Sequence, residues 1–251
     1  MEDLDRPREV AGAAAGILRT LEAFGFEWDG EVVRQQDRNE HYAEALRSLQ
    51  ARDLTFECSC SRRLLEDESR YPGTCRVRPS AAGVSTAIRL RVEPQAPILF
   101  TDRIQGTYRQ DVAAAVGDVI LRRRDQIFAY LLAVVVDDAA QGVTHVVRGA
   151  DLLDNTPRQI YLQRLLGLPT LCYAHVPVLT EADGAKLAKS RRSVSADTHA
   201  ALPQLLAVFA MLGLAPPDSL HRATLAEAWA WALEQWHINR VPKCLNMHVT
   251  N

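Results

Sequence analysis

Three of the chain's five cysteines, Cys58, Cys60 and Cys75, lie within eighteen residues of one another. Thiolates gathered on so short a segment suit a zinc ion, which binds sulfur ligands in a tetrahedron. The alternative is a set of partly buried cysteines without a metal. A metal here would be structural, because three or four protein ligands leave no open position for a substrate. The fourth ligand stays open, and the local candidates are Tyr71, Glu66, Asp67 and Glu68.

The chain has only three lysines, and two of them, Lys186 and Lys189, lie in the stretch 183–190. Flexible ammonium groups in a turn are suited to stabilising the charge that develops on a triphosphate when pyrophosphate leaves. The alternative is a solvated basic loop, which an isolated K-x-x-K-S sequence favours.

Four further residues could bind a ligand. Tyr130 and Arg148 lie near the ends of apolar segments, where open α/β sheets place their ligand sites. The planar fork of Arg148 could hold a carboxylate. Asp137 and Asp138 end a run of valines and could orient an amine or a ribose, or cap the next turn. Tyr130 and Arg148 could instead be ordinary half-buried residues.

Hydrophobic periodicity predicts the elements that position these residues. A first helix is expected to begin with Asp5 as its cap and Pro7 in its first turn, and to end at Gly25. A second helix follows, with its apolar face at Tyr42, Leu46 and Leu49. A third is expected to start at Thr156-Pro157 and to end at Gly167.

Strands are predicted at 54–56, 85–93, 134–136 and 143–147. The apolar–polar alternation of 85–93 indicates a half-exposed strand. The runs at 134–136 and 143–147 are rich in β-branched residues and are separated by helical segments. This pattern predicts an α/β fold with a parallel sheet covered on both faces.

From residue 196 onward the pattern is helical, with Pro216-Pro217 as a candidate joint. Thr224 and Glu227 have the spacing of a capping box. Two apolar stripes follow from the spacing, at Leu202, Leu205, Leu206, Phe209 and Leu212, and at Leu225, Trp229, Leu233 and Trp236.

Composition indicates a globular enzyme: 251 residues, 47% hydrophobic, 24% charged, and a formal net charge of −2. No apolar run reaches the roughly 18–20 residues of a membrane helix, so we expect a cytoplasmic protein without a membrane partner. An odd number of cysteines argues against a secreted disulfide framework. The arginines at 122–124 and 191–192 could contact phosphates, or could belong to solvated faces.

Several stretches, in the right order, resemble the glutamyl type of class I aminoacyl-tRNA synthetases. Residues 2–5 are similar to the E-D-x-D segment of that family, and residues 121–138 to its RRDG…Y…VVDD core. Residues 142–151 match GVTHVVRGAD, and KLAKS at 186–190 is a KMSKS motif. The resemblance covers residues 1 to about 192 and implies the domain organisation of the family. It implies a Rossmann-like catalytic domain at 1–195, a zinc-containing insertion at 54–112 within it, and an all-helical C-terminal subdomain at 196–251.

Within the family, the chain is most similar to the group that attaches glutamate to the queuosine base of tRNA(Asp). The C-x-C…Tyr…Cys cluster, the short stretch after KLAKS and the sequence RGADLL followed by TPRQIYLQ carry this resemblance. It implies that the substrates are L-glutamate, ATP and tRNA(Asp) bearing queuosine, with Mg²⁺ expected beside the ATP. We expect a monomer.

The same resemblance implies roles for individual residues. Glu2 would contact the amino group of glutamate, Tyr130 would line its pocket and Arg148 would hold a carboxylate. Lys186 and Lys189 would be catalytic, and Lys189 would bind ATP. The zinc ligands would be Cys58, Cys60, Tyr71 and Cys75.

Two departures from the family pattern stand out. Neither H-x-G-H nor H-x-G-N occurs in the sequence, and Ala188 replaces the usual Ser of the KMSKS motif. The change at Ala188 removes one hydroxyl and is expected to be tolerated. From the first departure we expect a chain that lacks the family's first strand and HIGH motif, exposes a sheet edge and has weak or no activity by itself. The alternatives are a fragment of a glutamyl-tRNA synthetase that charges tRNA(Glu), and a non-catalytic remnant that binds tRNA or zinc.

Overall fold

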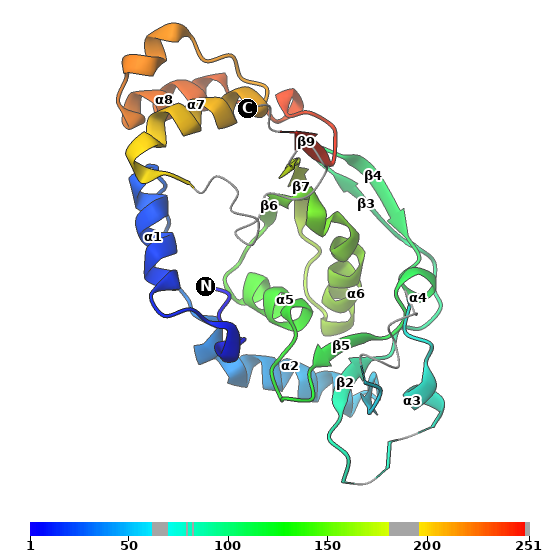
Figure 1. The fold of residues 1–251 in the computed structure, drawn as a ribbon. Coiled ribbons are helices and arrows are strands. Elements are labelled where there is room, and N and C mark those ends of the chain that lie inside the picture. Colours follow the sequence, from blue (N-terminus) through cyan, green and yellow to red (C-terminus); the bar gives the residue numbers. More distant parts are fainter. Residues whose placement is uncertain (62–69, 79, 82, 181–195, 249–251) are drawn as a thin grey trace.

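Two helices, α5 (Tyr130–Ala140) and α6 (Thr156–Leu166), lie in the middle of the molecule, and the other elements are arranged around them (Figure 1). Helix α1 (Ala13–Ala23) runs along one side, and α7 (Ala201–Met211) and α8 (Leu225–Gln235) lie together at one end. The structure is a computed structural model, and it describes residues 1–61, 70–78, 80–81, 83–180 and 196–248.

The centre of the fold is a βαβ unit. Strands β6 (His145–Gly149) and β7 (Cys172–Val176) pair in parallel, with Arg148 opposite His175. Helix α6 connects them, since parallel strands need a crossover, and it ends at Gly167 with a left-handed φ of 70°. The predicted strand at 143–147 and the predicted helix at 156–167 are thus confirmed. No described strand pairs with the other edge of β6, where Val147 is 68% exposed.

The valine run at 134–136 lies in helix α5, so its prediction as a strand was wrong. A short apolar run fits a buried strand and a buried helix equally well by periodicity. Helix α5 buries Leu132, Ala133 and Val135 between α6 and α2 (Asn39–Ala51). A helix that is apolar on most of its faces is typical of such a central position.

The largest sheet is antiparallel and not parallel as predicted; parallel pairing in the described residues is limited to two two-stranded pairs. Its central strand is β2 (Ala87–Leu90), and all four residues of this strand are buried, although the segment 85–93 was predicted to be half exposed. The polar member, Arg89, is buried because its guanidinium donates to the backbone oxygen of Asp118 at 2.8 Å. In spatial order its strands are β1 (Thr55–Cys58), β2 (Ala87–Leu90) and β5 (Val119–Arg122).

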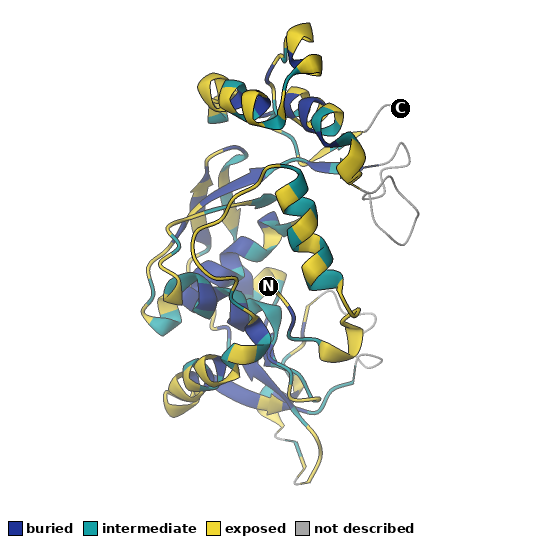
Figure 2. Cartoon of the chain, turned by 90° about the vertical axis from the view of Figure 1, so that its left-hand side faces the viewer, coloured by how far each residue is buried: buried dark blue, intermediate teal, exposed yellow. Residues whose placement is uncertain are grey.

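A hairpin of β3 (Ile98–Asp102) and β4 (Gly106–Gln110) packs against β7 and α6. Of two short helices, α3 (Thr74–Val77) lies against β1 and α4 (Val112–Ala115) follows β4. One hydrophobic cluster joins α2, α5, α6 and the strands around them. Figure 2 shows that the buried residues concentrate in these central elements. None of the described helices is both long and apolar enough to cross a membrane.

The N-terminal segment differs from its predicted single helix. Residues 6–8 form a 3-10 turn, η1 (Arg6–Arg8), and Asp5 makes no side-chain capping bond to it. Helix α1 begins only after Gly12, whose φ of 80° interrupts the helical path. Its predicted end is confirmed, since the Phe26 N–H bonds to Leu21 O across Gly25. The predicted apolar face of α2, Tyr42, Leu46 and Leu49, is buried.

After residue 196 the chain is mainly but not entirely helical. Helix α8 begins with the predicted capping box of Thr224 and Glu227. It buries Ala228 and Ala232, whereas Leu233 is 72% exposed, so the predicted apolar stripe was wrong at Leu233 and also at Trp236. A helix with one main packing partner, α7, buries only a narrow stripe.

The prediction that the C-terminal subdomain at 196–251 is all helical is also wrong. Residues 246–248 form β9 (Asn246–His248), which pairs in parallel with β8 (Val178–Thr180). The remaining elements after residue 196 are the 3-10 turns η6 (Thr198–Ala200), η7 (Asp218–Arg222) and η8 (Ile238–Arg240).

Candidate active site and metal site

Glu2, Tyr130 and Arg148 come from three separate elements and lie within electrostatic range of one another. Partial desolvation raises the pKa of Glu2, while the N-terminal ammonium and Arg148 lower it. Burial raises the pKa of Tyr130, with Arg148 opposing and Glu2 reinforcing the shift. The three residues predicted to bind glutamate are therefore near enough to influence one another electrostatically.

Each of the three is positioned by its backbone. Arg148 is the penultimate residue of β6, and Tyr130 is the first residue of α5. Glu2 lies between two residues tied to η2 (Gln35–Arg38). The carbonyl oxygen of Met1 accepts from the Gln35 N–H at 3.1 Å, and Asp3 Oδ1 accepts from the Gln36 N–H at 3.0 Å.

Asp138, on α5, belongs to the same cluster. Burial raises its pKa from 3.8 to about 6, with Arg148 opposing and the carboxylates of Asp137 and Glu2 adding to the rise. The neighbouring Asp137 has a different role. Its carboxylate accepts hydrogen bonds from Gln35, Arg38 and Tyr42, and so ties α5 to η2 and α2.

The guanidinium of Arg148 is held by neutral acceptors. Its Nη2 donates to Gln159 Oε1 at 2.7 Å and to Thr156 Oγ1 at 2.9 Å. Its Nε donates to His175 Nε2 at 3.1 Å. Among the residues that the structure describes, Arg148 forms no ion pair with a carboxylate. A guanidinium that is held in place and forms no direct ion pair can bind a carboxylate of a ligand.

His175, Gln159 and Thr156 were missed by the sequence analysis. The sequence gives no signal for His175, which stands in an apolar strand and is fully buried. Gln159 and Thr156 could have been suspected, because both lie on the helix that follows Arg148 and are separated by one turn.

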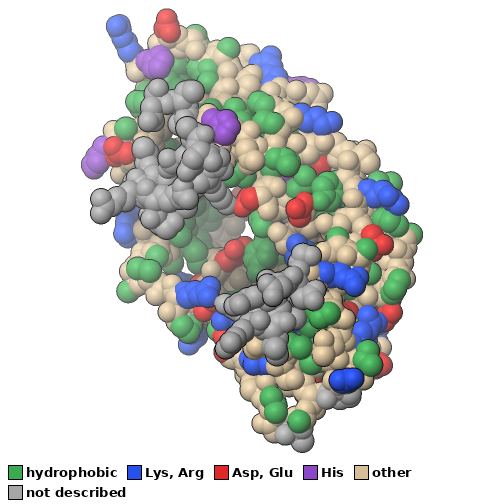
Figure 3. Space-filling view, turned by 45° about the vertical axis from the view of Figure 1, so that its right-hand side comes forward, with side chains coloured by type: hydrophobic (Ala, Val, Ile, Leu, Met, Phe, Trp, Pro, Cys, Tyr) green, Lys and Arg blue, Asp and Glu red, His purple; other side chains and the backbone are tan. Residues whose placement is uncertain are grey.

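Glu2 also lines a pocket of about 270 Å³ between the N-terminal segment and α1, together with Asp5, Arg8 and Ile17. On the face shown in Figure 3, outside the grey atoms, basic and acidic side chains are interspersed. This mixture agrees with the small net charge of the chain. Lys186 and Lys189 lie outside the described residues, as do the arginines at 191–192.

The cysteine cluster is assembled as predicted. Cys58 ends β1, Cys60 follows it and Cys75 lies on α3. Their three sulfur atoms lie within 4.8 Å of one another. The Tyr71 hydroxyl lies 3.5 Å from Cys58 Sγ and 3.9 Å from Cys60 Sγ. Glu66, Asp67 and Glu68, the other candidate ligands, lie outside the described residues.

The chemistry of this cluster fits a metal. Zinc–sulfur bonds of about 2.3 Å place two thiolates of a tetrahedron about 3.8 Å apart, close to the observed spacing. Burial alone would raise the pKa of Cys75, but hydrogen bonds, first from the Ser59 N–H and then from Cys60, lower it to about 6. Burial and the hydrogen bond to Cys75 raise the pKa of Cys60 to about 11. The thiolate form of Cys75 is therefore favoured before any metal binds.

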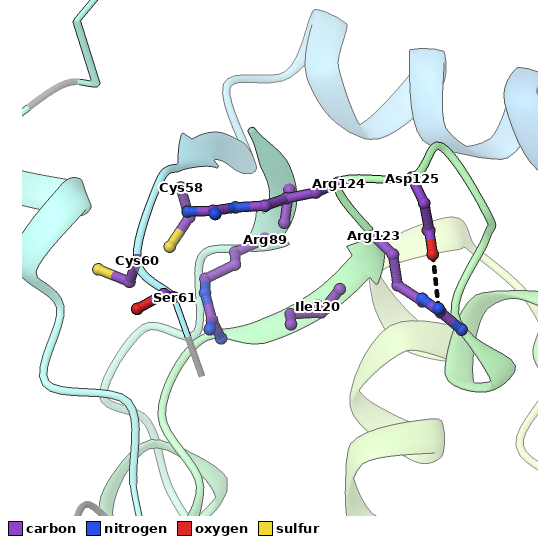
Figure 4. A pocket seen from close by; sticks show the side chains of 9 residues that line it. Cys58, Cys60, Ser61, Arg89, Ile120, Arg123, Arg124 and Asp125 are labelled. Atoms are coloured by element: carbon purple, nitrogen blue, oxygen red, sulfur yellow. Dashed lines mark hydrogen bonds and ion pairs between the residues drawn. The ribbon is translucent and has the colours of Figure 1, made fainter. Parts of the chain in front are cut away.

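A pocket of about 310 Å³ adjoins the cluster, lined by Cys58, Cys60, Arg89 and Arg124 among others (Figure 4). Arg89 lies over the Tyr71 ring, 3.9 Å from its centroid. Arg123, one of the arginines that could contact phosphates, instead forms ion pairs with Asp5 and Asp125.

The model of the family "tRNA synthetases class I (E and Q), catalytic domain" matches residues 1–214. The glutamyl-Q tRNA(Asp) synthetase of Pseudomonas fluorescens is 50% identical over 248 residues, which cover 98% of this chain and 83% of that protein. The protein of the same name from Thiobacillus denitrificans is 51% identical over 249 residues, covering 96% of this chain and 82% of that protein.

Two solved structures share the fold. A glutamate-tRNA synthetase from Elizabethkingia anophelis has a TM-score of 0.79 at 20% identity, covering 99% of this chain and 60% of that one. A glutamate tRNA ligase from Elizabethkingia meningosepticum, in complex with its amino acid, has a TM-score of 0.78 at 20% identity, covering 100% of this chain and 59% of that one.

Proposed function

The chain belongs to the class I tRNA synthetases of the E and Q type, and we propose that it activates L-glutamate with ATP and transfers the glutamate to the queuosine base of tRNA(Asp). The proposed transfer is based on the relatives that are about half identical to this chain. They are named glutamyl-Q tRNA(Asp) synthetases and match nearly all of its residues.

The observation that carries this proposal is the environment of Arg148. Its guanidinium is held by hydrogen bonds to Gln159, Thr156 and His175, and it interacts electrostatically with Glu2, Tyr130 and Asp138. Glutamate presents two carboxylates and one ammonium. Arg148 would hold a carboxylate, Glu2 would contact the ammonium and Tyr130 would line the pocket.

In the first step of the proposed reaction, an α-carboxylate oxygen of glutamate attacks the α-phosphorus of ATP. The bond to the β-phosphate breaks, and pyrophosphate leaves from glutamyl-adenylate. Lys186 and Lys189 would stabilise the charge on the phosphates, with Lys189 as the ATP ligand, and Mg²⁺ would neutralise phosphate charge when bound. In the second step, a cyclopentene hydroxyl of queuosine attacks the activated carbonyl, loses its proton and displaces AMP. Neither step needs a protein nucleophile, so positioning and charge stabilisation account for catalysis.

We also propose a division of the chain into a Rossmann-like catalytic domain at 1–195, which includes an insertion at 54–112, and a C-terminal subdomain at 196–251. The compact cluster of Leu205, Leu206, Phe209, Ala228 and Ala232 supports a separate C-terminal core. The cysteine cluster, which has its own small apolar cluster, supports the insertion.

The direct test is transfer of labelled glutamate to queuosine-containing tRNA(Asp), with unmodified tRNA(Asp) and tRNA(Glu) as controls. We expect label on the queuosine-containing tRNA alone, and a loss of at least about tenfold in the variant Arg148→Lys, which cannot reproduce the planar fork. Label on tRNA(Glu) would instead support a tRNA(Glu)-charging enzyme.

The rate at which this chain activates glutamate is a separate expectation. Because the 251 residues contain neither H-x-G-H nor H-x-G-N, we expect slow glutamate-dependent ATP–pyrophosphate exchange. Fast exchange would show that another segment replaces that motif. Tight tRNA or zinc binding with no exchange and no transfer would favour the non-catalytic remnant.

We propose that Cys58, Cys60, Cys75 and Tyr71 hold one structural zinc ion, which would join β1 to α3. We expect about one zinc per chain by elemental analysis, and a clear loss of zinc and of thermal stability in Cys75→Ser. Tyr71→Phe should weaken zinc binding by about tenfold in a chelator competition. The matched control is Cys172→Ser, at an exposed cysteine of β7, which should keep its zinc. Zinc-free wild-type protein that is equally stable with and without added zinc would contradict this assignment.

A further inference from the structure

We infer that His175 is a positioning residue for Arg148, and that Asp102 fixes the tautomer in which His175 does so. The inference rests on the proposed role of Arg148 as the residue that holds a carboxylate of glutamate. It assigns to the end of β3, within the predicted insertion, a part in glutamate recognition.

The three residues form a hydrogen-bonded chain across β3, β7 and β6, of which Asp102 and His175 are buried and Arg148 is partly buried. Arg148 and His175 are directly opposite each other in the parallel pair β6–β7. The side chains of His175 and Asp102 are fully buried, and His175 Nδ1 lies 2.6 Å from Asp102 Oδ2. His175 Nε2 in turn lies 3.1 Å from Arg148 Nε.

Asp102 is held as an ionised acceptor. Its Oδ1 accepts from the backbone N–H groups of Ile104, Gln105 and His175 at 3.0, 2.8 and 3.1 Å. Burial alone would raise the pKa of Asp102, but the hydrogen bonds, first that from His175, lower it. An ionised carboxylate can only accept, so Oδ2 requires the proton on His175 Nδ1.

The tautomer determines what His175 offers to Arg148. With the proton on Nδ1, Nε2 carries a lone pair and accepts from the Arg148 Nε–H. Together with the bonds from Nη2 to Gln159 and Thr156, this contact fixes the plane of the guanidinium. In this tautomer the three hydrogen-bond partners of the guanidinium, His175, Gln159 and Thr156, are neutral, so none of them forms an ion pair that would compete with a bound anion.

Two substitutions of His175 separate its hydrogen bond to Arg148 from its hydrogen bond to Asp102. The Oε1 of His175→Gln can take the place of Nε2 and accept from Arg148, while the bond to Asp102 is lost. The amide of His175→Asn can take the place of Nδ1 and donate to Asp102, while the contact with Arg148 is lost. Glutamate affinity of the 251-residue chain, measured by calorimetry, should fall about tenfold or more in the Asn variant and within about threefold in the Gln variant.

Asp102→Asn extends the test to the tautomer. Its amide would donate to His175 Nδ1 and move the histidine proton to Nε2, which would then face the Arg148 Nε–H as a second donor. We expect a loss of glutamate affinity at least as large as in His175→Asn. His145→Gln, at an exposed histidine of β6, is the control and should bind as the wild type does.

A nitrogen NMR spectrum of the wild-type histidines reports the tautomer without any substrate. We expect a protonated Nδ1 and an unprotonated Nε2 for His175, and the reverse in Asp102→Asn. A wild-type Nε2–H tautomer, or equal glutamate affinity in folded Gln and Asn variants, would overturn the inference. If the wild type shows the expected tautomer but binds no glutamate, the hydrogen-bonded arrangement of Asp102, His175 and Arg148 is supported and the proposed function is contradicted.

Discussion

Asp138 is a partly buried carboxyl group whose pKa is raised by its surroundings. Burial raises its pKa from 3.8 to about 6, and the neighbouring Asp137 and Glu2 add to the rise against the opposing charge of Arg148. The native state therefore binds a proton at Asp138 more tightly than the unfolded state does. This contribution to stability is complete below about pH 4 and is lost as the pH rises through about 6.

We predict that Asp138→Asn removes this pH dependence. The free energy of unfolding of the variant should change less than that of the wild type between pH 4 and 7, as measured by urea denaturation. Glu234→Gln, on an exposed part of α8, is the control and should follow the wild-type curve. Parallel curves for Asp138→Asn and wild type would contradict the assignment.

Among helices and strands, the most specific connection is that between α5 and α2. The carboxylate of Asp137 accepts from Arg38 Nε at 2.6 Å, Tyr42 Oη at 2.8 Å and Gln35 Nε2 at 3.0 Å. This connection fixes the N-terminal part of the site, because Gln35 also holds the backbone of Met1 next to Glu2.

We predict that Asp137→Ala lowers the free energy of unfolding by about 3 kcal/mol, since it leaves the largely buried guanidinium of Arg38 uncompensated. Asp137→Asn keeps one acceptor oxygen and should lose less. Urea denaturation measures both. A loss below about 1 kcal/mol in the Ala variant would show that water replaces the carboxylate.

At the scale of the whole molecule, the two ends of the chain are joined through Trp229. Its indole N–H donates to Phe24 O at 2.8 Å, and its ring packs edge-on against Phe26, with centroids 5.2 Å apart. Gly25 lies so close to the indole that an added Cβ would be 3.0 Å from its nitrogen. These contacts connect the segment after α1 to α8, so that the N-terminal and C-terminal parts of the chain meet on one side of the molecule (Figure 1).

We predict that Trp229→Leu destabilises the protein by about 2 kcal/mol, through the lost hydrogen bond and aromatic packing. Amide exchange at Gly25 and Phe26 should accelerate in the same variant. Trp236→Leu is the matched control, because Trp236 is 44% exposed, and it should change neither quantity appreciably. Unchanged exchange at residues 25 and 26 would mean that α1 is held by other contacts.

The amino-acid sequence was enough to identify the family, to predict most helices and to locate the cysteine cluster. Cysteine spacing predicted the cluster that the structure assembles, and the capping box at Thr224 and the apolar face of α2 were confirmed. These features are local, since capping and amphipathic spacing depend on residues within one or two turns.

The residues that surround Arg148, and the apolar runs that form helices, became apparent from the packing of the folded chain. The run at 134–136 lies in a helix enclosed by α2 and α6, and Arg89 can be buried because the distant carbonyl of Asp118 accepts a hydrogen bond from its guanidinium. Asp102 and His175 are 73 residues apart, so no local pattern could pair them. Burial and long-range hydrogen bonds depend on the packing of separate elements, and that information is spread over the whole chain.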